Sequence, residues 1–283
     1  MPELPEVETV RRELEKRIVG KKIAKIEVLE KKQFLGDPKK VVGREIKSIW
    51  RRAKVLVIDI NGLILLVHLK MTGQIIYLSN KKRLVSVGHP LPFILNQLPN
   101  KTTRLVINLD DSSRLFFNDL RKFGWFKLLT KKQAEVELAD FGPEPLGKDF
   151  TLRYFINSLG RTRRVVKMAL LDQRLVAGIG NIYASEVLFA ARVSPRRQAN
   201  SLSDQEISRL YRAIKEILSE AIDYGGTSAA DQAYVRPDAS PGRYQNKLGV
   251  YQREGKPCYS CGGIVKKIKQ NNRSTFWCPG CQK

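Results

Sequence analysis

Residues 258–281 read CYSCGGIVKKIKQNNRSTFWCPGC, and this stretch contains all four cysteines of the chain. Cys258 and Cys261 form one C-x2-C pair, Cys278 and Cys281 form a second, and sixteen residues separate the two pairs. Two such pairs present the four thiolates that a tetrahedral zinc ion prefers. Because all four positions would be filled by protein ligands, we expect one structural zinc ion and no metal catalysis.

The residues between the two pairs predict a β-hairpin, in which Ile264–Lys269 and Ser274–Trp277 pair across Gln270–Arg273. A unit of about forty residues, 245–283, buries too little apolar surface to fold unaided, so bound metal would supply folding energy. Two disulfides are the alternative use of four cysteines, but nothing in the chain indicates export to an oxidising compartment.

The whole chain is strongly basic. Its 283 residues include 51 Lys and Arg against 28 Asp and Glu, a net charge of +23. The commonest partner of such a chain is nucleic acid. An anionic membrane surface, an RNA-bound structural role and a lysine-rich solvated surface are the alternatives. The basic clusters are spread along the chain, at Arg51-Arg52, Lys131-Lys132, Arg161–Arg164 and Lys266–Lys269.

No targeting or membrane segment is evident in the sequence. The longest apolar stretches, Leu63–Val67 and Val165–Leu171, are shorter than the run of about 18 residues that a membrane span needs. The first ten residues, MPELPEVETV, contain three Glu and no hydrophobic segment of a secretory signal. We therefore expect an intracellular protein.

The N-terminal half of the chain predicts one helix followed by many strands. Pro5 suits a first helical position, Gly20 ends the segment, and apolar residues recur between them every three or four positions. From Lys22 to about Thr130 the pattern is that of an antiparallel sandwich or barrel. The expected strands are Ile23–Leu29, Val55–Ile60, Leu63–Leu69, Gln74–Leu78, Arg104–Leu109, Arg114–Phe117 and Trp125–Leu128.

The second half predicts helices. Ser203 and Glu206 form a capping box before an apolar stripe, and Gly225-Gly226 ends that helix. We therefore expect an α+β multidomain fold: a β-sandwich domain with a leading helix at 1–135, a linker at 136–147, a helical domain at 148–244 and a zinc-binding hairpin at 245–283. The linker interpretation depends on the Pro- and Gly-rich segment Asp140–Lys148. A polar loop, 226–246, follows the last helix.

Three motifs together resemble one family. They are PELPEVE at Pro2–Glu8, GIGNIYASE at Gly178–Glu186 and the terminal cysteine pairs. With the basic charge and the RKFG segment, the chain resembles, from end to end, the formamidopyrimidine-DNA glycosylases of bacterial base-excision repair. The resemblance implies a helix–two-turn–helix motif and a monomeric enzyme in the bacterial cytoplasm, associated with the nucleoid through DNA binding. The implied activity is removal of oxidised purines, 8-oxoguanine and formamidopyrimidines, from double-stranded DNA, with apurinic/apyrimidinic lyase activity.

The resemblance also assigns catalytic roles. Removal of the initiator Met would expose the secondary amine of Pro2, which attacks C1′ of the damaged nucleotide and forms a Schiff base. Glu3 acts as general acid or base, and Lys54 lies near the Schiff base and a phosphate. Arg273 grips the phosphate near the reacting sugar. Glu6 resembles an orienting carboxylate, and its alternative role is a partner of the helix dipole.

Further residues are assigned to DNA binding by the same resemblance. His68 resembles a phosphate contact, and Met71, Arg121 and Phe123 resemble a wedge that fills the space left by the extruded base. Taken alone, His68 would be a hydrogen-bonded strand-end histidine and Phe123 a core residue. Asn181, Arg163 and Lys167 resemble contacts to the DNA backbone, and the loop 226–246 matches the region that covers the extruded base.

The sequence departs from the family pattern at two places and leaves other functions open. The family's paired arginine is Arg121-Lys122 here, which keeps the first member. Thr102 and Thr103 stand where the family usually has a histidine, which puts one phosphate contact in doubt. An endonuclease VIII-like glycosylase for oxidised pyrimidines and a non-catalytic zinc-dependent DNA-binding protein are the alternatives. A zinc-ribbon protein that binds RNA is a weaker one.

Overall fold

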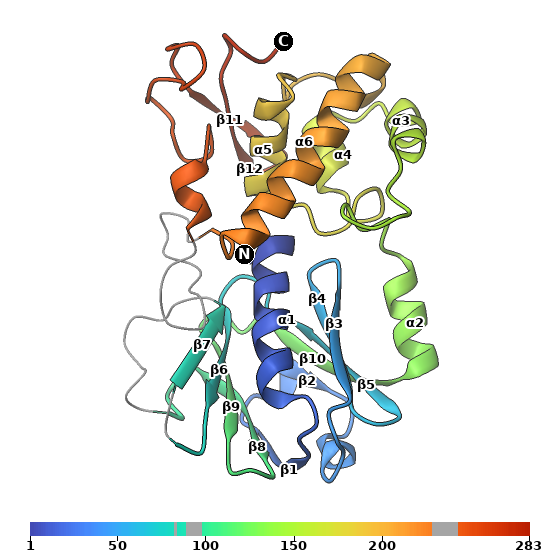
Figure 1. The fold of residues 1–283 in the computed structure, drawn as a ribbon, viewed down its shortest axis with the longest axis vertical. Helices are drawn as coiled ribbons and strands as arrows, with labels where there is room; N and C mark the ends of the chain where they lie inside the picture. Colours follow the sequence, from blue (N-terminus) through green and yellow to red (C-terminus); the bar gives the residue numbers. More distant parts are fainter. Residues whose placement is uncertain (82–83, 89–97, 228–242) are drawn as a thin grey trace. The chain divides into compact units, whose positions relative to one another are not determined.

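The computed structural model of the chain describes residues 1–81, 84–88, 98–227 and 243–283. They form two compact units, both drawn in Figure 1. Unit 1 comprises Met1–Asp140 and Tyr224–Arg243, and unit 2 comprises Phe141–Asp223 and Tyr244–Lys283. No described helix combines the length and the apolar character that a membrane crossing requires. Most of the expected loop 226–246 lies outside the described residues.

Unit 1 contains two five-stranded sheets. The strands of the first are β1 (Ile23–Val28), β6 (Gly73–Leu78), β7 (Leu84–Gly88), β8 (Thr103–Leu109) and β9 (Arg114–Asp119). The strands of the second are β2 (Phe34–Leu35), β3 (Ser48–Arg52), β4 (Val55–Asp59), β5 (Leu63–His68) and β10 (Trp125–Thr130). Their orders are β1-β8-β9-β6-β7 and β2-β10-β5-β4-β3. Among the described strands of unit 1, β2 and β10 pair in parallel and the other pairs are antiparallel.

Helix α1 (Leu4–Ile18) completes the core of this sandwich. It packs against β3 and β7, the last strand of each sheet, as Figure 1 shows. Its buried stripe, Val7, Val10, Leu14 and Ile18, belongs to one apolar cluster with the inner faces of both sheets. Because each such side chain contributes roughly 1.5–3 kcal/mol when buried, the stripe firmly anchors the start of the chain.

Two loops cross from one sheet to the other at the same end of the sandwich. One joins β5 to β6, and the other joins β9 to β10. Since β5 pairs with β10 and β6 pairs with β9, the two loops run side by side. Gly73 begins β6 where a Cβ would lie 2.3 Å from the carbonyl oxygen of Leu69, so the first loop requires glycine there.

Unit 2 is mainly helical. Its helices are α3 (Leu152–Gly160), α4 (Val166–Leu171), α5 (Asn181–Ala190) and α6 (Asp204–Asp223), and α6 packs against α3 and α5. The expected capping box is confirmed, because Ser203 N–H donates to Glu206 Oε2 at 2.9 Å and Glu206 N–H donates to Ser203 Oγ at 3.3 Å. The described chain also contains short 3-10 helices at Lys31–Gln33, Pro38–Val41, Ala199–Ser201 and Tyr244–Lys247.

The expected hairpin is present as β11 (Lys266–Gln270) and β12 (Arg273–Trp277), which pair in antiparallel register. Asn271 and Asn272 form its two-residue turn with φ values of 43° and 60°. Asparagine tolerates this left-handed conformation. A two-residue hairpin turn requires it, because the turn has to match the twist of the two strands. The turn places Arg273 at the first position of β12.

Several elements differ from the sequence-based expectation. All seven expected strands are present, but β2, β3 and β7 were not predicted. Helix α2 (Lys131–Ala139) occupies the start of the expected linker, and only its Ala134 is buried, so it has no apolar stripe to reveal it. Tyr224–Thr227, expected with the helical domain, groups with unit 1.

Candidate functional site

The residues that follow Met1 are buried at the start of unit 1. Pro2 is buried, and Glu3 and Glu6 are only 3% and 2% exposed. The two carboxylates belong to a capping box at the start of α1, in which the N–H of Glu3 donates to Glu6 Oε2 at 2.8 Å. Glu is rarely buried without partners. The burial of Glu6 is thus accompanied by hydrogen bonds at the start of the helix, and the catalytic roles of Glu3 and Glu6 remain predictions.

Glu6 also holds the segment that follows α6. Its Oε1 accepts the N–H of Thr227 at 2.8 Å and the Thr227 hydroxyl at 3.1 Å. A Cβ on Gly226, whose φ is +80°, would lie 2.8 Å from the same oxygen. Thr227 pairs with Arg243 in an isolated bridge, so Glu6 fixes the base of the loop that lies between these two residues.

Lys54 lies in the turn between β3 and β4. The preceding Ala53 has a φ of +52°, and the Arg51 guanidinium donates to its carbonyl oxygen at 2.9 Å. Arg51 Nε also lies 3.2 Å from the Glu8 carboxylate of α1. Lys54 itself is buried. The turn that carries the expected catalytic lysine is therefore attached, through Arg51 and Glu8, to the helix that Glu3 caps.

His68 is the last residue of β5 and is held neutral. Its Nδ1 accepts the N–H of Lys70 at 2.9 Å, which leaves Nε2 as the N–H donor. Burial, together with the charges of Lys70 and Lys54, lowers the pKa of His68 to about 3. A neutral imidazole with its donor nitrogen available is suited to a phosphate oxygen.

The three expected wedge residues come together on the two crossing loops. Met71 lies on the β5–β6 loop, and Arg121 and Phe123 lie on the β9–β10 loop. Arg121 Nη1 lies 3.0 Å from Met71 Sδ, and its guanidinium carbon lies 4.8 Å from the centre of the Phe123 ring. Met71 is 40% and Phe123 is 52% exposed. The structure thus excludes the alternative that Phe123 is a core residue.

In unit 2, two expected DNA-binding residues hold the zinc hairpin. Asn181 Nδ2 donates to the Ser274 carbonyl oxygen at 3.0 Å, and Lys167 Nζ donates to the same oxygen at 3.1 Å. Lys167 Nζ also donates to the Thr275 hydroxyl at 2.9 Å, and its side chain is fully buried. In the observed conformation Lys167 therefore positions the hairpin. Arg273, next to Ser274, is exposed.

Arg163 is exposed on the segment between α3 and α4. In the same unit, Asn181 is the first residue of α5, and the N-cap residue of that helix is Gly180, which has no side chain to cap it. A helix N-terminus of this kind attracts a phosphate. The expected contacts of Arg163 and Asn181 with the DNA backbone therefore remain predictions.

Glu186 ties α5 to the segment that leads to the cysteines. Its carboxylate accepts the N–H groups of Gly249, Val250 and Tyr251 at 2.7, 3.1 and 2.7 Å. Burial raises the pKa of Glu186, and the three N–H donors oppose that rise. Glu186 was recognised only as the end of a motif, and no local sequence signal indicates this contact across more than sixty residues.

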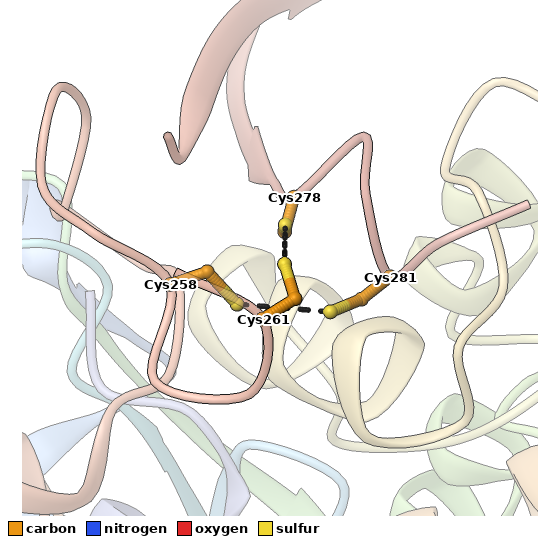
Figure 2. Close-up of side chains that lie close together, drawn as sticks. All are labelled: Cys258, Cys261, Cys278 and Cys281. Carbon is orange, nitrogen blue, oxygen red and sulfur yellow. Dashed lines mark hydrogen bonds between the residues drawn. The ribbon is translucent and has the colours of Figure 1, made fainter. Parts of the chain in front are cut away.

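The four cysteines converge as Figure 2 shows, and all are free thiols. Their sulfur atoms lie within 4.8 Å of one another. The Cys258–Cys281 and Cys261–Cys278 sulfur distances are 3.7 and 3.5 Å. Four thiolates about 2.3 Å from a tetrahedral zinc would be about 3.8 Å apart, so the cluster fits this ion.

The surroundings of the cluster support the same assignment. A Cβ on Gly280 would lie 3.0 Å from Cys261 Sγ, so the chain passes closely over the sulfurs. Burial raises the pKa of Cys258, but N–H donors and the neighbouring thiols lower it to about 7. Burial and the neighbouring thiols raise the pKa of Cys281 to about 12. A divalent cation is what allows all four to ionise together.

Comparisons with known proteins agree along the whole chain. Residues 1–126 match the formamidopyrimidine-DNA glycosylase N-terminal domain, 141–233 match the H2TH domain of the same enzyme, and 255–283 match a zinc finger found in FPG and IleRS. The formamidopyrimidine-DNA glycosylase of Listeria monocytogenes serovar 1/2a is 42% identical, and the alignment covers 100% of both chains. This chain belongs to the formamidopyrimidine-DNA glycosylase family. The enzyme of Heliobacterium modesticaldum is also 42% identical over 100% of both chains.

Solved structures of the family have the same fold. The Lactococcus lactis Fpg in complex with DNA containing an abasic site has a TM-score of 0.88 and 37% identity, with 99% of each chain covered. MutM in complex with DNA containing carbocyclic 8-oxo-G has a TM-score of 0.88 and 38% identity over 100% of both chains. The α+β fold and the cysteine zinc finger expected from the sequence are thus confirmed.

Proposed function

We propose that this chain is a bifunctional DNA glycosylase that removes oxidised purines from duplex DNA and then cleaves the strand. The catalytic groups are the processed N-terminal amine of Pro2 and the carboxylate of Glu3. The observation that carries the proposal is the burial of Pro2, Glu3 and Glu6 together at the start of α1. A DNA-binding protein without catalysis needs no buried acidic N-terminus.

The proposed chemistry begins when Met1 is removed, because the Pro2 nitrogen is otherwise part of a peptide bond. The free secondary amine attacks C1′, and the bond from C1′ to the base breaks as the departing base takes the electron pair and the proton that the amine loses. Protonated Glu3 then donates its proton to the ring oxygen as the bond from C1′ to that oxygen breaks and the sugar opens. The product is a cationic iminium between Pro2 and C1′. It withdraws electrons and acidifies the proton on C2′.

Loss of that C2′ proton expels the 3′ phosphate, and a second elimination expels the 5′ phosphate. Water then hydrolyses the iminium and returns the free amine. Arg273 would bind a phosphate beside the reacting sugar, and Lys54 would favour the unprotonated amine by its charge. The zinc ion held by the four cysteines would stabilise the hairpin that carries Arg273 and would take no part in these steps.

The binding residues divide between the two units. In unit 1, Met71, Arg121 and Phe123 would fill the space left by the extruded base, and His68 would donate to a phosphate. In unit 2, Asn181 and the exposed Arg163 would bind phosphates. Relatives in complex with lesion-containing DNA support a duplex substrate. We also propose a monomer in the bacterial cytoplasm, associated with the nucleoid through DNA.

Borohydride trapping tests the proposal. Processed protein is mixed with a duplex that contains one 8-oxoguanine opposite cytosine, borohydride is added, and the adduct is mapped by mass spectrometry. We expect one covalent adduct on Pro2 and strand cleavage with phosphate at both ends of the gap. The matched control is protein that retains Met1, which should bind the duplex and form no adduct.

The other outcomes contradict parts of the proposal. Cleavage by protein that retains Met1 would exclude Pro2 as the nucleophile. Faster excision of thymine glycol than of 8-oxoguanine would place the chain with the endonuclease VIII-like enzymes. Duplex binding with no adduct on any lesion would leave a zinc-dependent DNA-binding protein.

A further inference from the structure

Asp119 is a fully buried carboxylate whose hydrogen bonds converge from three parts of unit 1. It is the last residue of β9 and has no exposed surface. Its Oδ2 accepts the N–H of Gly124 at 2.7 Å and the side-chain amide of Gln33 at 2.9 Å. Its Oδ1 accepts the hydroxyl of Thr72. Within the described residues, none of these donors is a cation.

A buried carboxylate without a cation is costly, and it persists only where several donors satisfy both oxygens. Here all three donors belong to segments that lead into or support the wedge. Thr72 follows Met71, Gly124 follows Phe123, and Gln33 donates a second hydrogen bond to the Gly124 carbonyl oxygen at 2.8 Å. The carboxylate therefore joins the two crossing loops to the sheet at one point.

The hydroxyl of Thr72 extends this connection to the third wedge residue. It donates to Asp119 Oδ1 and accepts the N–H of Arg121 at 3.0 Å. The backbone next to Met71, at Arg121 and next to Phe123 is thus tied into one hydrogen-bonded network. Close packing restricts the second loop further, because a Cβ on Gly124 would lie 2.5 Å from the Phe117 ring.

The wedge side chains cannot be held by packing in the free protein, since Met71 and Phe123 are substantially exposed. A side chain that enters a base stack has to resist the pressure of restacking, which requires a rigid backbone beneath it. We propose that Asp119 is a positioning residue that, through Thr72 and Gly124, holds the Met71, Arg121 and Phe123 wedge in its inserting arrangement. This inference rests on the proposed glycosylase function and adds a residue that itself touches no DNA.

The reaction offers a readout that a general structural role would not change selectively. Excision of 8-oxoguanine requires a stacked and paired base to leave the helix, whereas a preformed abasic site has no base to unstack. A loosened wedge should therefore slow base excision much more than strand cleavage at an abasic site. A loss of folded protein would reduce both rates by the same factor.

The test uses Thr72→Val, which removes the bridging hydroxyl but keeps the branched shape. We expect single-turnover excision of 8-oxoguanine to fall about tenfold or more, and cleavage of the same duplex with an abasic site to change less than about twofold. Thr72→Ser restores the hydroxyl and should recover excision. Asp119→Asn should act in the same direction as Thr72→Val.

Ser113→Ala is the matched control. Ser113 precedes the other end of β9, is fully buried, and donates its hydroxyl to an aspartate, Asp111. Its loss should leave the ratio of the two rates unchanged. Equal reductions of both rates in Thr72→Val, or no reduction in either, would overturn the positioning role. If the wild-type chain cleaves neither duplex, the proposed function itself is wrong.

Discussion

The carboxylate of Glu6 accepts the N–H of Thr227 at 2.8 Å, a hydrogen bond between residues 221 positions apart. The other oxygen of the same carboxylate accepts the N–H of Glu3 at 2.8 Å. One buried side chain therefore links the proposed catalytic N-terminus to the base of the loop after Thr227. Loss of this carboxylate would remove the acceptor of both N–H groups, and each buried group left without its partner costs about 1–3 kcal/mol.

Glu6→Ala should release both N–H groups. We expect the amide of Thr227 to exchange with deuterium about tenfold faster or more, because its charged acceptor is lost. We also expect excision of 8-oxoguanine to slow. Glu13→Ala is the control on the same helix, since among the described residues the Glu13 carboxylate pairs with Lys16 and Arg17 near the surface. Unchanged exchange at Thr227 in Glu6→Ala would show that the loop base is held by other contacts.

His68 should make the stability of the fold depend on pH. Its pKa is about 3 in the folded chain and about 6.5 when unfolded, so between these values the unfolded state binds the extra proton. The free energy of unfolding therefore falls as the pH drops below about 6.5, by up to about 1.4 kcal/mol per unit. Between pH 7 and 5, wild type should lose about 2 kcal/mol more than His68→Gln in urea titrations. Equal losses in both proteins would contradict a neutral His68.

The four cysteines should behave as one metal site. Titration of the folded chain with a mercurial thiol reagent should release one zinc ion for every four thiols modified. Cys261→Ser should lose zinc and weaken duplex binding, whereas Ser260→Ala, on the same knuckle, should keep both. Fewer than four reactive thiols in the denatured and unreduced protein would revive the disulfide alternative.

Arg273 should contribute one phosphate contact. Each neutralised phosphate adds about 0.9 to the slope of log affinity against log salt. Arg273→Ala should therefore weaken duplex binding and reduce that slope by about one. Lys267→Ala removes a positive charge from the same hairpin. Because the Lys267 ammonium already lies 3.4 Å from the Glu254 carboxylate, we expect this variant to change the slope less than Arg273→Ala does. A slope that changes equally in both variants would mean that the hairpin acts only through its total charge.

Local patterns were sufficient for much of the fold. The stripe of α1 and the seven expected strands follow from side-chain periodicity, and the zinc ligands follow from the spacing of two C-x2-C pairs. Helix α2 and strand β3 escaped prediction for the same physical reason. Helix α2 buries one residue and therefore lacks the apolar period of a helix. Strand β3 reads SIWRR and therefore lacks the alternation of apolar and polar residues that marks a strand.

The candidate site was predicted as a set of residue types rather than as an arrangement. Pro2, Glu3 and the wedge residues were recognised from motifs, but nothing local showed that Lys167 is buried beneath the hairpin. Its periodic position on α4 is equally compatible with an exposed DNA contact. Burial depends on which distant segment covers a side chain, and that is a property of the assembled unit.

The sequence by itself determined the zinc ligands, the helix that carries Glu3 and the basic character of the chain, because each depends on neighbouring residues or on composition. Only the tertiary structure decided that Asp119 lies between Thr72 and Gly124, and that Glu6 meets Thr227. The contact of Asp119 with Thr72 spans 47 residues and that of Glu6 with Thr227 spans 221. They form because buried polar groups must find partners wherever the fold brings donors to them.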